Sequence, residues 1–162
     1  MEQVQQVPPP EVRHAEELAR LAEEKGPRPP GWLLTPQAVV AFVCGNDRLK
    51  ISRKFVGDVS LVERCVITLA GERALLLVGE PGTAKSMLSE LLSAAICGTS
   101  GLTVQGSAGT TEDQLRYGWN YAQLLARGPS EDALVDSPVL AAMRTGRVAR
   151  VEEITRCLPE VQ

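Results

Sequence analysis

The sequence predicts an α/β fold built around a parallel β-sheet. Residues 74–78 (ALLLV) form an apolar run without polar alternation, which is typical of a strand covered on both faces. An amphipathic helix is expected over residues 85–97, and a second strand over residues 102–105. A strand, a helix and a strand joined by short turns form a βαβ unit, in which the two strands run parallel.

Composition limits the class of protein. The chain has 162 residues, which suits one globular domain. With 44% hydrophobic and 23% charged residues, it is not a disordered tail, a collagen-like fibre or a disulfide scaffold. The net charge of -3 provides no basic field for nucleic acid or an anionic membrane. Since no signal-like start and no apolar run of ~20 residues occurs, we expect a cytoplasmic protein.

Two short helices are expected before the main body. The first covers residues 11–25, after a poorly ordered lead-in, with His14 facing the solvent. Its apolar face would consist of Val12, Ala15, Leu18, Ala19 and Ala22. The second helix begins after the N-cap Thr35, has Pro36 at its first position and stops at Gly45.

These features divide the chain into three parts. Residues 1–30 hold the lead-in and first helix, residues 31–53 hold the second helix and a linker, and residues 54–162 form the main domain. In the main domain, Asp58 or Ser60 would cap a further helix that Gly71 closes. We also expect a helix over residues 138–143 and a strand over residues 147–151. The apolar faces of the helices starting near residues 58 and 85 comprise Leu61, Val62, Cys65, Val66 and Leu69, and Leu88, Leu91, Leu92, Ala95 and Ile96.

An anion-binding loop joins the strand at residues 74–78 to the helix at residues 85–97. Its residues are Gly79, Glu80, Pro81, Gly82, Thr83, Ala84, Lys85 and Ser86. Small residues let successive backbone N–H groups point at one anion, with the positive end of the helix behind them. Lys85 would neutralise β- and γ-phosphate oxygens, and the Ser86 hydroxyl would bind Mg²⁺. The alternative is a plain strand-to-helix turn with a stray lysine, but the flanking elements favour nucleotide binding.

Ala84 departs from the pattern G-x-x-x-x-G-K-[S/T], which has glycine at this position. A left-handed alanine would cost about 1 to 2 kcal/mol, whereas a right-handed one that opens the helix would cost little. We expect the right-handed conformation.

Two acids, Glu152 and Glu153, follow the strand expected over residues 147–151. Glu152 would hold Mg²⁺ through its water shell, and Glu153 would orient and help to deprotonate the attacking water. Paired glutamates can also be a solvated helix start, but the upstream loop favours the catalytic interpretation. Arg150 is an unusual side chain for a central strand. Of the cysteines, none has a C-x-x-C partner or a nearby histidine, so we expect buried free thiols at Cys44, Cys65, Cys97 and Cys157.

The loop GEPGTAKS, the acids in VEEITR and the stretch between them resemble the MoxR branch of the AAA+ ATPases, where alanine before the loop lysine is common. The resemblance covers about residues 55–162. It implies a P-loop NTPase fold, a three-layer α/β/α sandwich with a parallel sheet, here preceded by short helices. It also implies ATP and Mg²⁺ as cofactors, Val56 and Gly57 near the adenine, and Glu152 and Glu153 as the Walker B acids, with Lys85 and Glu153 catalytic.

The resemblance further implies a homo-oligomeric ring, usually a hexamer, whose ATP cycle remodels or matures other protein complexes. Partners in this family often carry von Willebrand factor A domains. Residues 110–118 (TTEDQLRYG) look like the segment that leads into the helix 2 insert, a loop that engages clients. An equally weighted alternative is a surface helix and loop with no client role, because Trp119 and Tyr121 could be core residues.

The chain ends soon after Glu153, before any place for the family's sensor strand, arginine finger and helical lid. We therefore expect a truncated sheet with an open apolar face, prone to aggregation. Without an arginine finger, the rate of ATP hydrolysis should be lower by a factor of about 10³ to 10⁵. Two hypotheses follow: the N-terminal part of a MoxR-type ATPase, or a nucleotide-binding module without turnover. A P-loop kinase ranks lower, since the acids followed by Ile154, Thr155 and Arg156 favour water as the acceptor.

Overall fold

The computed structural model describes residues 7–71 and 73–162, in a mixed α/β arrangement that is largely helical. The chain divides into two units, the first ending at Gly101 and the second beginning at Leu102, and each unit is described by itself. The first six residues of the expected lead-in lie outside the described residues. The division at residues 30 and 53 stays a prediction.

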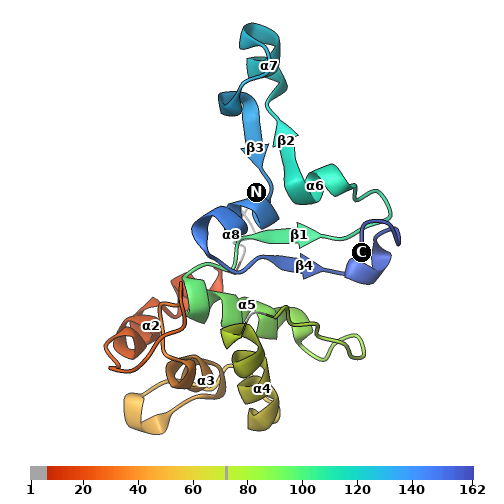
Figure 1. Ribbon diagram of the computed structural model, residues 1–162. Helices are drawn as coiled ribbons and strands as arrows, with labels where there is room; N and C mark the ends of the chain where they lie inside the picture. The colour runs from red at the N-terminus through yellow and green to blue at the C-terminus, as the bar shows by residue number, and fades with distance from the viewer. Residues whose placement is uncertain (1–6, 72) are drawn as a thin grey trace, which may run out of the picture. The chain divides into compact units, whose positions relative to one another are not determined.

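The first unit is helical. Its elements are α1 (Pro10–Arg13), α2 (Ala15–Ala22), α3 (Pro36–Cys44), the 3₁₀ turn η1 (Asp47–Leu49), α4 (Val59–Ala70) and α5 (Lys85–Cys97). Helix α3 packs against both α4 and α5 (Figure 1). The largest fully buried side chains of this core are Phe42, Leu21, Leu34, Leu91, Leu92 and Ile96.

Helices α3, α4 and α5 confirm the expected caps, but on α4 only Val62, Cys65 and Val66 of the expected face are buried, and Leu61 is exposed. The Thr35 hydroxyl accepts a hydrogen bond from the Ala38 N–H at 3.1 Å, and Pro36 begins α3. The Asp58 carboxylate accepts one from the Ser60 N–H at 3.0 Å at the start of α4. Gly98 ends α5 with a left-handed conformation (φ 73°). The apolar residues expected on α5 are all buried.

The expected helix over residues 11–25 is wrong in two respects. It is broken at His14, where φ is -118° and ψ is 26°, so α1 and α2 are separate. The break rotates the buried face: Leu21 is in the core, whereas Val12 is exposed. His14 also does not face the solvent, because its ring is half-buried with an edge-on contact to the Phe42 ring, 5.9 Å between centroids.

The strand expected over residues 74–78 is not formed. Residues 73–80 contain neither helix nor strand, and the side chains of Leu76 and Val78 are 71% and 85% exposed. A strand is stabilised by hydrogen bonds to neighbouring strands. Among the described residues no strand pairs with this segment, so its apolar character alone does not order it. The βαβ unit expected from residue 74 to residue 105 is therefore absent.

The second unit contains the two other strands expected from the sequence, near residues 103 and 150. Strand β1 (Thr103–Gln105) pairs in parallel with β4 (Arg150–Glu152), and Gln105 lies opposite Glu152. Strands β2 (Tyr117–Trp119) and β3 (Leu134–Asp136) form an antiparallel hairpin with α7 (Tyr121–Arg127) at its far end (Figure 1). The remaining elements are α6 (Glu112–Arg116), α8 (Pro138–Thr145) and the 3₁₀ turns η2 (Glu131–Ala133) and η3 (Ile154–Arg156).

The prediction of free thiols is confirmed for all four cysteines, and the prediction of burial for three of them. All four thiols are free, three of them are buried and Cys44 is half-buried. Burial raises the pKa of the Cys44 and Cys65 thiols, which keeps both protonated at neutral pH. Across residues 7–71 and 73–162, no helix combines the length and apolarity needed to cross a bilayer.

Candidate functional site

The phosphate loop, residues 79–86, leads directly into α5. Two of its residues have left-handed backbone conformations: Gly82 with φ 80° and Ala84 with φ 60° and ψ 27°. The expected right-handed Ala84 is therefore wrong. Ala84 is the N-cap of α5 and makes no side-chain capping bond. Its left-handed backbone lies where the chain turns from the loop into the helix. This geometry costs an alanine about 1 to 2 kcal/mol.

The Lys85 side chain folds back over its own loop. Its Nζ donates hydrogen bonds to the carbonyl oxygens of Gly79 (2.8 Å) and Glu80 (2.7 Å) and to the Thr83 hydroxyl (3.3 Å). The Thr83 hydroxyl in turn donates to the Glu80 carbonyl at 2.8 Å. The loop therefore brings Gly79, Glu80, Thr83 and Lys85 together around one ammonium group.

Backbone donors of the loop lie at the start of α5. The N–H groups of Gly82, Ala84 and Lys85 donate no hydrogen bond to any residue that the structure describes. Behind them α5 extends for 13 residues, and the first bond of its ladder runs from the Leu88 N–H to the Ala84 carbonyl. N–H groups that donate no hydrogen bond, the positive end of a helix dipole and an ammonium group together form an environment that attracts an anion.

The acids lie at the end of β4 in the second unit. Glu152 is the last strand residue, and its Oε1 accepts a hydrogen bond from the Arg150 Nη1 at 3.0 Å. Arg150 Nη2 also donates to the Thr103 hydroxyl of β1 at 2.8 Å. These contacts explain how an arginine fits this strand: its side chain is only 10% exposed, and its charge is balanced.

Glu153 is the next residue and has a left-handed backbone (φ 53°, ψ 39°). Its carboxylate faces water, paired with the Arg156 Nε at 3.2 Å. A non-glycine residue held in this region signals a local constraint. The turn thus places the two carboxylates differently, with Glu152 in the strand's polar cluster and Glu153 outside it.

Sequence reasoning missed Gly106, which follows β1 and makes this turn possible. Its N–H donates to the Glu152 carbonyl at 2.8 Å. A Cβ at this position would lie 2.6 Å from the Glu153 carbonyl oxygen and 2.9 Å from that of Glu152, closer than any real Cβ contact. A glycine directly after a strand is the only sequence signal for this close approach.

The loop belongs to the first unit and the acids belong to the second. The residues expected to contact adenine, Val56 and Gly57, lie in the first unit. The Val56 side chain is 87% exposed, although the preceding residue, Phe55, is buried. Arg53 donates to the Phe55 and Gly57 carbonyls, both at 3.0 Å.

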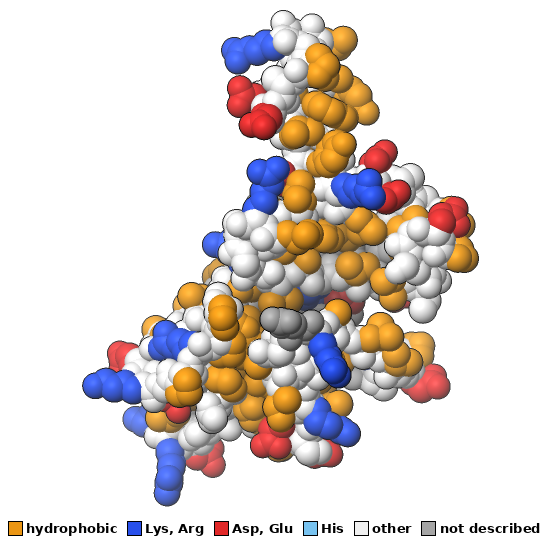
Figure 2. All heavy atoms as spheres, viewed as in Figure 1, with side chains coloured by type: hydrophobic (Ala, Val, Ile, Leu, Met, Phe, Trp, Pro, Cys, Tyr) orange, Lys and Arg blue, Asp and Glu red, His pale blue; other side chains and the backbone are white. Residues whose placement is uncertain are grey.

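The segment expected to lead into a client-binding insert forms α6 and continues into the hairpin. Trp119 and Tyr121 are not core residues: they are 37% and 73% exposed. Hydrophobic side chains gather along one side of the hairpin, and charged side chains lie on the opposite side (Figure 2). The exposed hydrophobic residues of the hairpin and α7 are Tyr117, Trp119, Tyr121, Leu125 and Val135.

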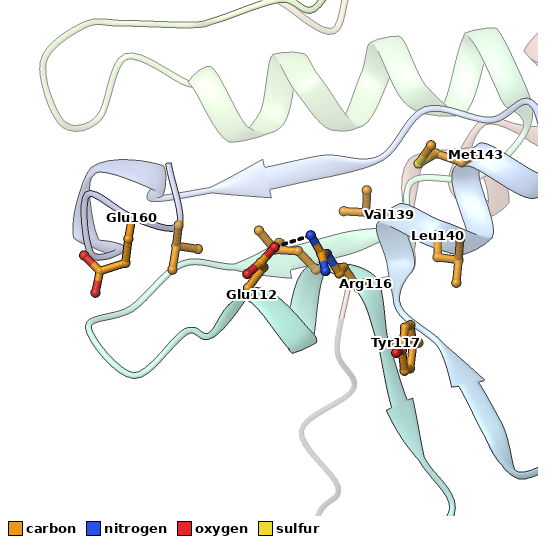
Figure 3. A pocket seen from close by; sticks show the side chains of 9 residues that line it. Glu112, Arg116, Tyr117, Val139, Leu140, Met143 and Glu160 are labelled. Carbon is orange, nitrogen blue, oxygen red and sulfur yellow. Dashed lines mark ion pairs between the residues drawn. The ribbon is translucent and has the colours of Figure 1, made fainter. Parts of the chain in front are cut away.

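A groove of about 540 Å³ lies at the base of this hairpin. The ion pair between Glu112 and Arg116 borders it, and apolar side chains from α8 point into it (Figure 3). Its lining is formed by Glu112, Leu115, Arg116, Tyr117, Val139, Leu140, Met143, Glu160 and Val161. None of the expected phosphate or acid residues lines this groove.

Comparison with known proteins agrees with the motif assignment at family level. Residues 74–162, more than half of the chain, match the family model for the AAA domain (dynein-related subfamily). The chain is 56% identical over 158 residues to the uncharacterized protein YehL of Escherichia coli (strain K12), covering 97% of this chain and 44% of that relative. It thus spans less than half the length of the relative it matches. No solved structure matches the chain. The chain belongs to the AAA domain family, dynein-related subfamily, whose fold is a P-loop nucleotide-binding α/β fold.

Proposed function

We propose that this chain is the nucleotide-binding part of a MoxR-type AAA+ ATPase, which couples ATP hydrolysis to the remodelling or maturation of partner protein complexes. The observation that carries the proposal is the loop at residues 79–86, where the Lys85 ammonium and undonated N–H groups meet at the start of α5. The family match supports nucleotide binding at this loop.

In this proposal, binding exchanges one set of contacts for another. The Lys85 ammonium leaves the carbonyl oxygens of Gly79 and Glu80 and binds β- and γ-phosphate oxygens. The N–H groups from Gly82 to Ser86 donate to the same phosphates. Val56 and Gly57 contact the adenine. The loop thus carries the affinity, and residues 56–57 the preference for the base.

The oxygen donors expected for Mg²⁺ suit that ion. Mg²⁺ prefers oxygen ligands and keeps several waters, so one or two protein groups suffice. Ser86 would supply a hydroxyl and Glu152 a carboxylate, and the bound ion would neutralise charge on the phosphate oxygens. Arg150 orients the Glu152 carboxylate by donating a hydrogen bond to it within β4.

Glu153 is proposed as the general base. Its carboxylate is exposed, so water reaches it, and its left-handed backbone separates it from the Arg150 cluster. It would orient a water molecule and accept its proton during attack on the γ-phosphate.

The binding test compares Lys85→Ala with Lys25→Ala, a lysine on the exposed surface outside the loop. We expect Lys85→Ala to weaken binding of a fluorescent ATP analogue about 10- to 100-fold, because a charged hydrogen-bond partner of the phosphates is lost. Lys25→Ala should bind like the wild type. Equal affinity of the wild type and Lys85→Ala would reject the phosphate-loop assignment.

A nucleotide-binding module without turnover is the second candidate. Steady phosphate release that Glu153→Gln abolishes while ATP binding persists would reject it. Absence of release from a chain that still binds ATP would favour it.

The ring and client aspects have their own support. The exposed hydrophobic side of the hairpin is typical of a surface that contacts another protein (Figure 2). We expect a ring, usually a hexamer, in the complete protein, with a von Willebrand factor A domain protein as a possible class of partner. Analytical ultracentrifugation of the complete protein with and without ATP would check the ring, and a monomer under both conditions would reject it.

A further inference from the structure

The strap at residues 52–57 (SRKFVG) carries Val56 and Gly57 and is fastened to the first unit at several points. The N–H groups of Lys54 and Phe55 both donate to the Val43 carbonyl at 3.1 Å. The Phe55 side chain is buried, and a Cβ added at Gly57 would lie 2.3 Å from its ring. The backbone around Val56 therefore has little freedom to move.

Helix α2 fastens the other end of the strap through Glu17. One carboxylate oxygen, Oε1, accepts hydrogen bonds from the Ser52 N–H (3.2 Å) and the Ser52 hydroxyl (2.8 Å), and Oε2 is paired with the Lys54 ammonium. Lys54 also donates to the Phe42 and Ser52 carbonyls at 3.0 and 2.9 Å. The Lys54 and Glu17 side chains are 5% and 16% exposed, so this ion pair is largely buried.

The exposed Val56 is the unusual feature of this strap. An apolar side chain in water on a mobile loop needs no explanation, but here the backbone on both sides is held by buried groups. Fixing a backbone costs conformational entropy, and a fixed apolar contact lowers the cost of binding a flat apolar ligand. The fastening thus presents Val56 to a ligand.

We propose that Glu17 is a positioning residue for the nucleotide base, which acts by holding the strap so that Val56 and Gly57 can contact adenine. The inference rests on the proposed function, in which the loop at residues 79–86 binds ATP. It gives the helices before residue 54 a role in base recognition, although they lie outside the matched residues 74–162.

The same unit provides a matched control in Glu11 of α1. Its Oε1 accepts from the Ser100 N–H at 2.9 Å and its Oε2 from the Ser100 hydroxyl at 2.9 Å. Glu11 therefore holds a serine much as Glu17 does, but that serine follows α5 and is not part of the strap. Glu11→Ala removes both hydrogen bonds to Ser100 without releasing residues 52–57.

The experiment measures the affinities of ATP and of inorganic tripolyphosphate, by competition with a fluorescent ATP analogue, for the wild type, Glu17→Ala and Glu11→Ala. The ratio of the two affinities reports the contribution of the nucleoside. If the released strap holds its position a tenth of the time, Glu17→Ala should lower this ratio about tenfold. Tripolyphosphate binding should stay unchanged, and Glu11→Ala should keep the wild-type ratio.

Two further measurements keep the test decisive. If Glu17→Ala fails to fold, the double variant Glu17→Met with Lys54→Met replaces the ion pair by apolar side chains and still releases Ser52. Hydrogen exchange should show faster exchange of the Lys54 and Phe55 amides in the Glu17 variants but not in Glu11→Ala.

An unchanged ratio in a folded Glu17 variant, or an equal fall in Glu11→Ala, would overturn the role of Glu17. A wild type that shows no Lys85-dependent binding of ATP is a different result. It would reject the proposed function, and the inference with it.

Discussion

Helix α5 and the apolar segment at residues 74–78 belong to one unit but differ in secondary structure and burial. Residues 85–97 bury a continuous row of side chains, including Leu88, Leu91 and Leu92. Residues 74–78 are equally apolar, yet Leu76 and Val78 are exposed and no strand forms. A helix makes its hydrogen bonds within its own segment, whereas a strand requires another one. Apolar sequence thus yields order only where the backbone bonds can also be closed.

The largest effect is expected for Leu91→Ala in α5. Leu91 is fully buried, so the variant should lose about 4 kcal/mol of the free energy of unfolding through lost transfer energy and a cavity. Leu125→Ala on the exposed surface of α7 should change it by less than about 0.5 kcal/mol. Urea denaturation measures both, and equal losses would contradict the burial described for α5.

A pH dependence is expected on the helical side of the comparison. Burial and the nearby Lys54 ammonium lower the pKa of His14 from its ordinary value of 6.5. The unfolded chain therefore binds this proton first, and stability should fall as the pH drops below about 6.5. His14→Gln should remove that phase in urea denaturation measured at a series of pH values, and an unchanged profile would contradict it.

A second phase belongs to Glu17. Burial alone would raise the pKa of its carboxyl, but hydrogen bonds from Lys54 and Ser52 outweigh burial and lower the pKa from its ordinary value of 4.5. The stabilisation is complete above about pH 4.5 and is lost as the pH falls through the lowered value. Glu17→Gln should flatten this part of the same profile.

Ala84→Gly is expected to have a smaller effect of the opposite sign. It removes a left-handed alanine, a gain of about 1 to 2 kcal/mol, and part of this is offset by the freedom of glycine in the unfolded chain. The net increase in the free energy of unfolding should be about 1 kcal/mol. Ala19→Gly, on the exposed side of α2, should instead lose about 0.5 to 1 kcal/mol, and a loss at both positions would contradict the strain at Ala84.

The smallest effect is expected for Leu76→Ser. Because this leucine is 71% exposed, the free energy of unfolding should change by less than about 0.5 kcal/mol. A loss of several kcal/mol in thermal or urea denaturation would show that residues 74–78 are a buried strand after all.

Features governed by local chemistry could be predicted from the sequence. The caps Thr35 and Asp58 and the stops at Gly45 and Gly71 depend on residues within one turn of each helix. Strands near residues 103 and 150 could also be predicted, although their pairing with each other could not.

Features governed by tertiary partners could not. The break at His14, the Glu17–Lys54 pair and the balance of charge around Arg150 depend on groups distant in sequence or on backbone angles. In the candidate site, the loop and acids are recognisable as motifs. Their roles in binding and catalysis stay predictions, and the left-handed Ala84 shows that a motif does not specify each dihedral angle.

The crowded backbone beside Gly106 has a consequence for protein engineering. Every other amino acid has a Cβ atom, which at this position would collide with the backbone carbonyl oxygens of Glu152 and Glu153. A library that randomises this position should therefore return glycine, whatever reaction is selected, since any replacement would push the carboxylate-bearing turn away from β1. Arg150 and Thr103 are no freer, because the Arg150 side chain bridges the Glu152 carboxylate and the Thr103 hydroxyl.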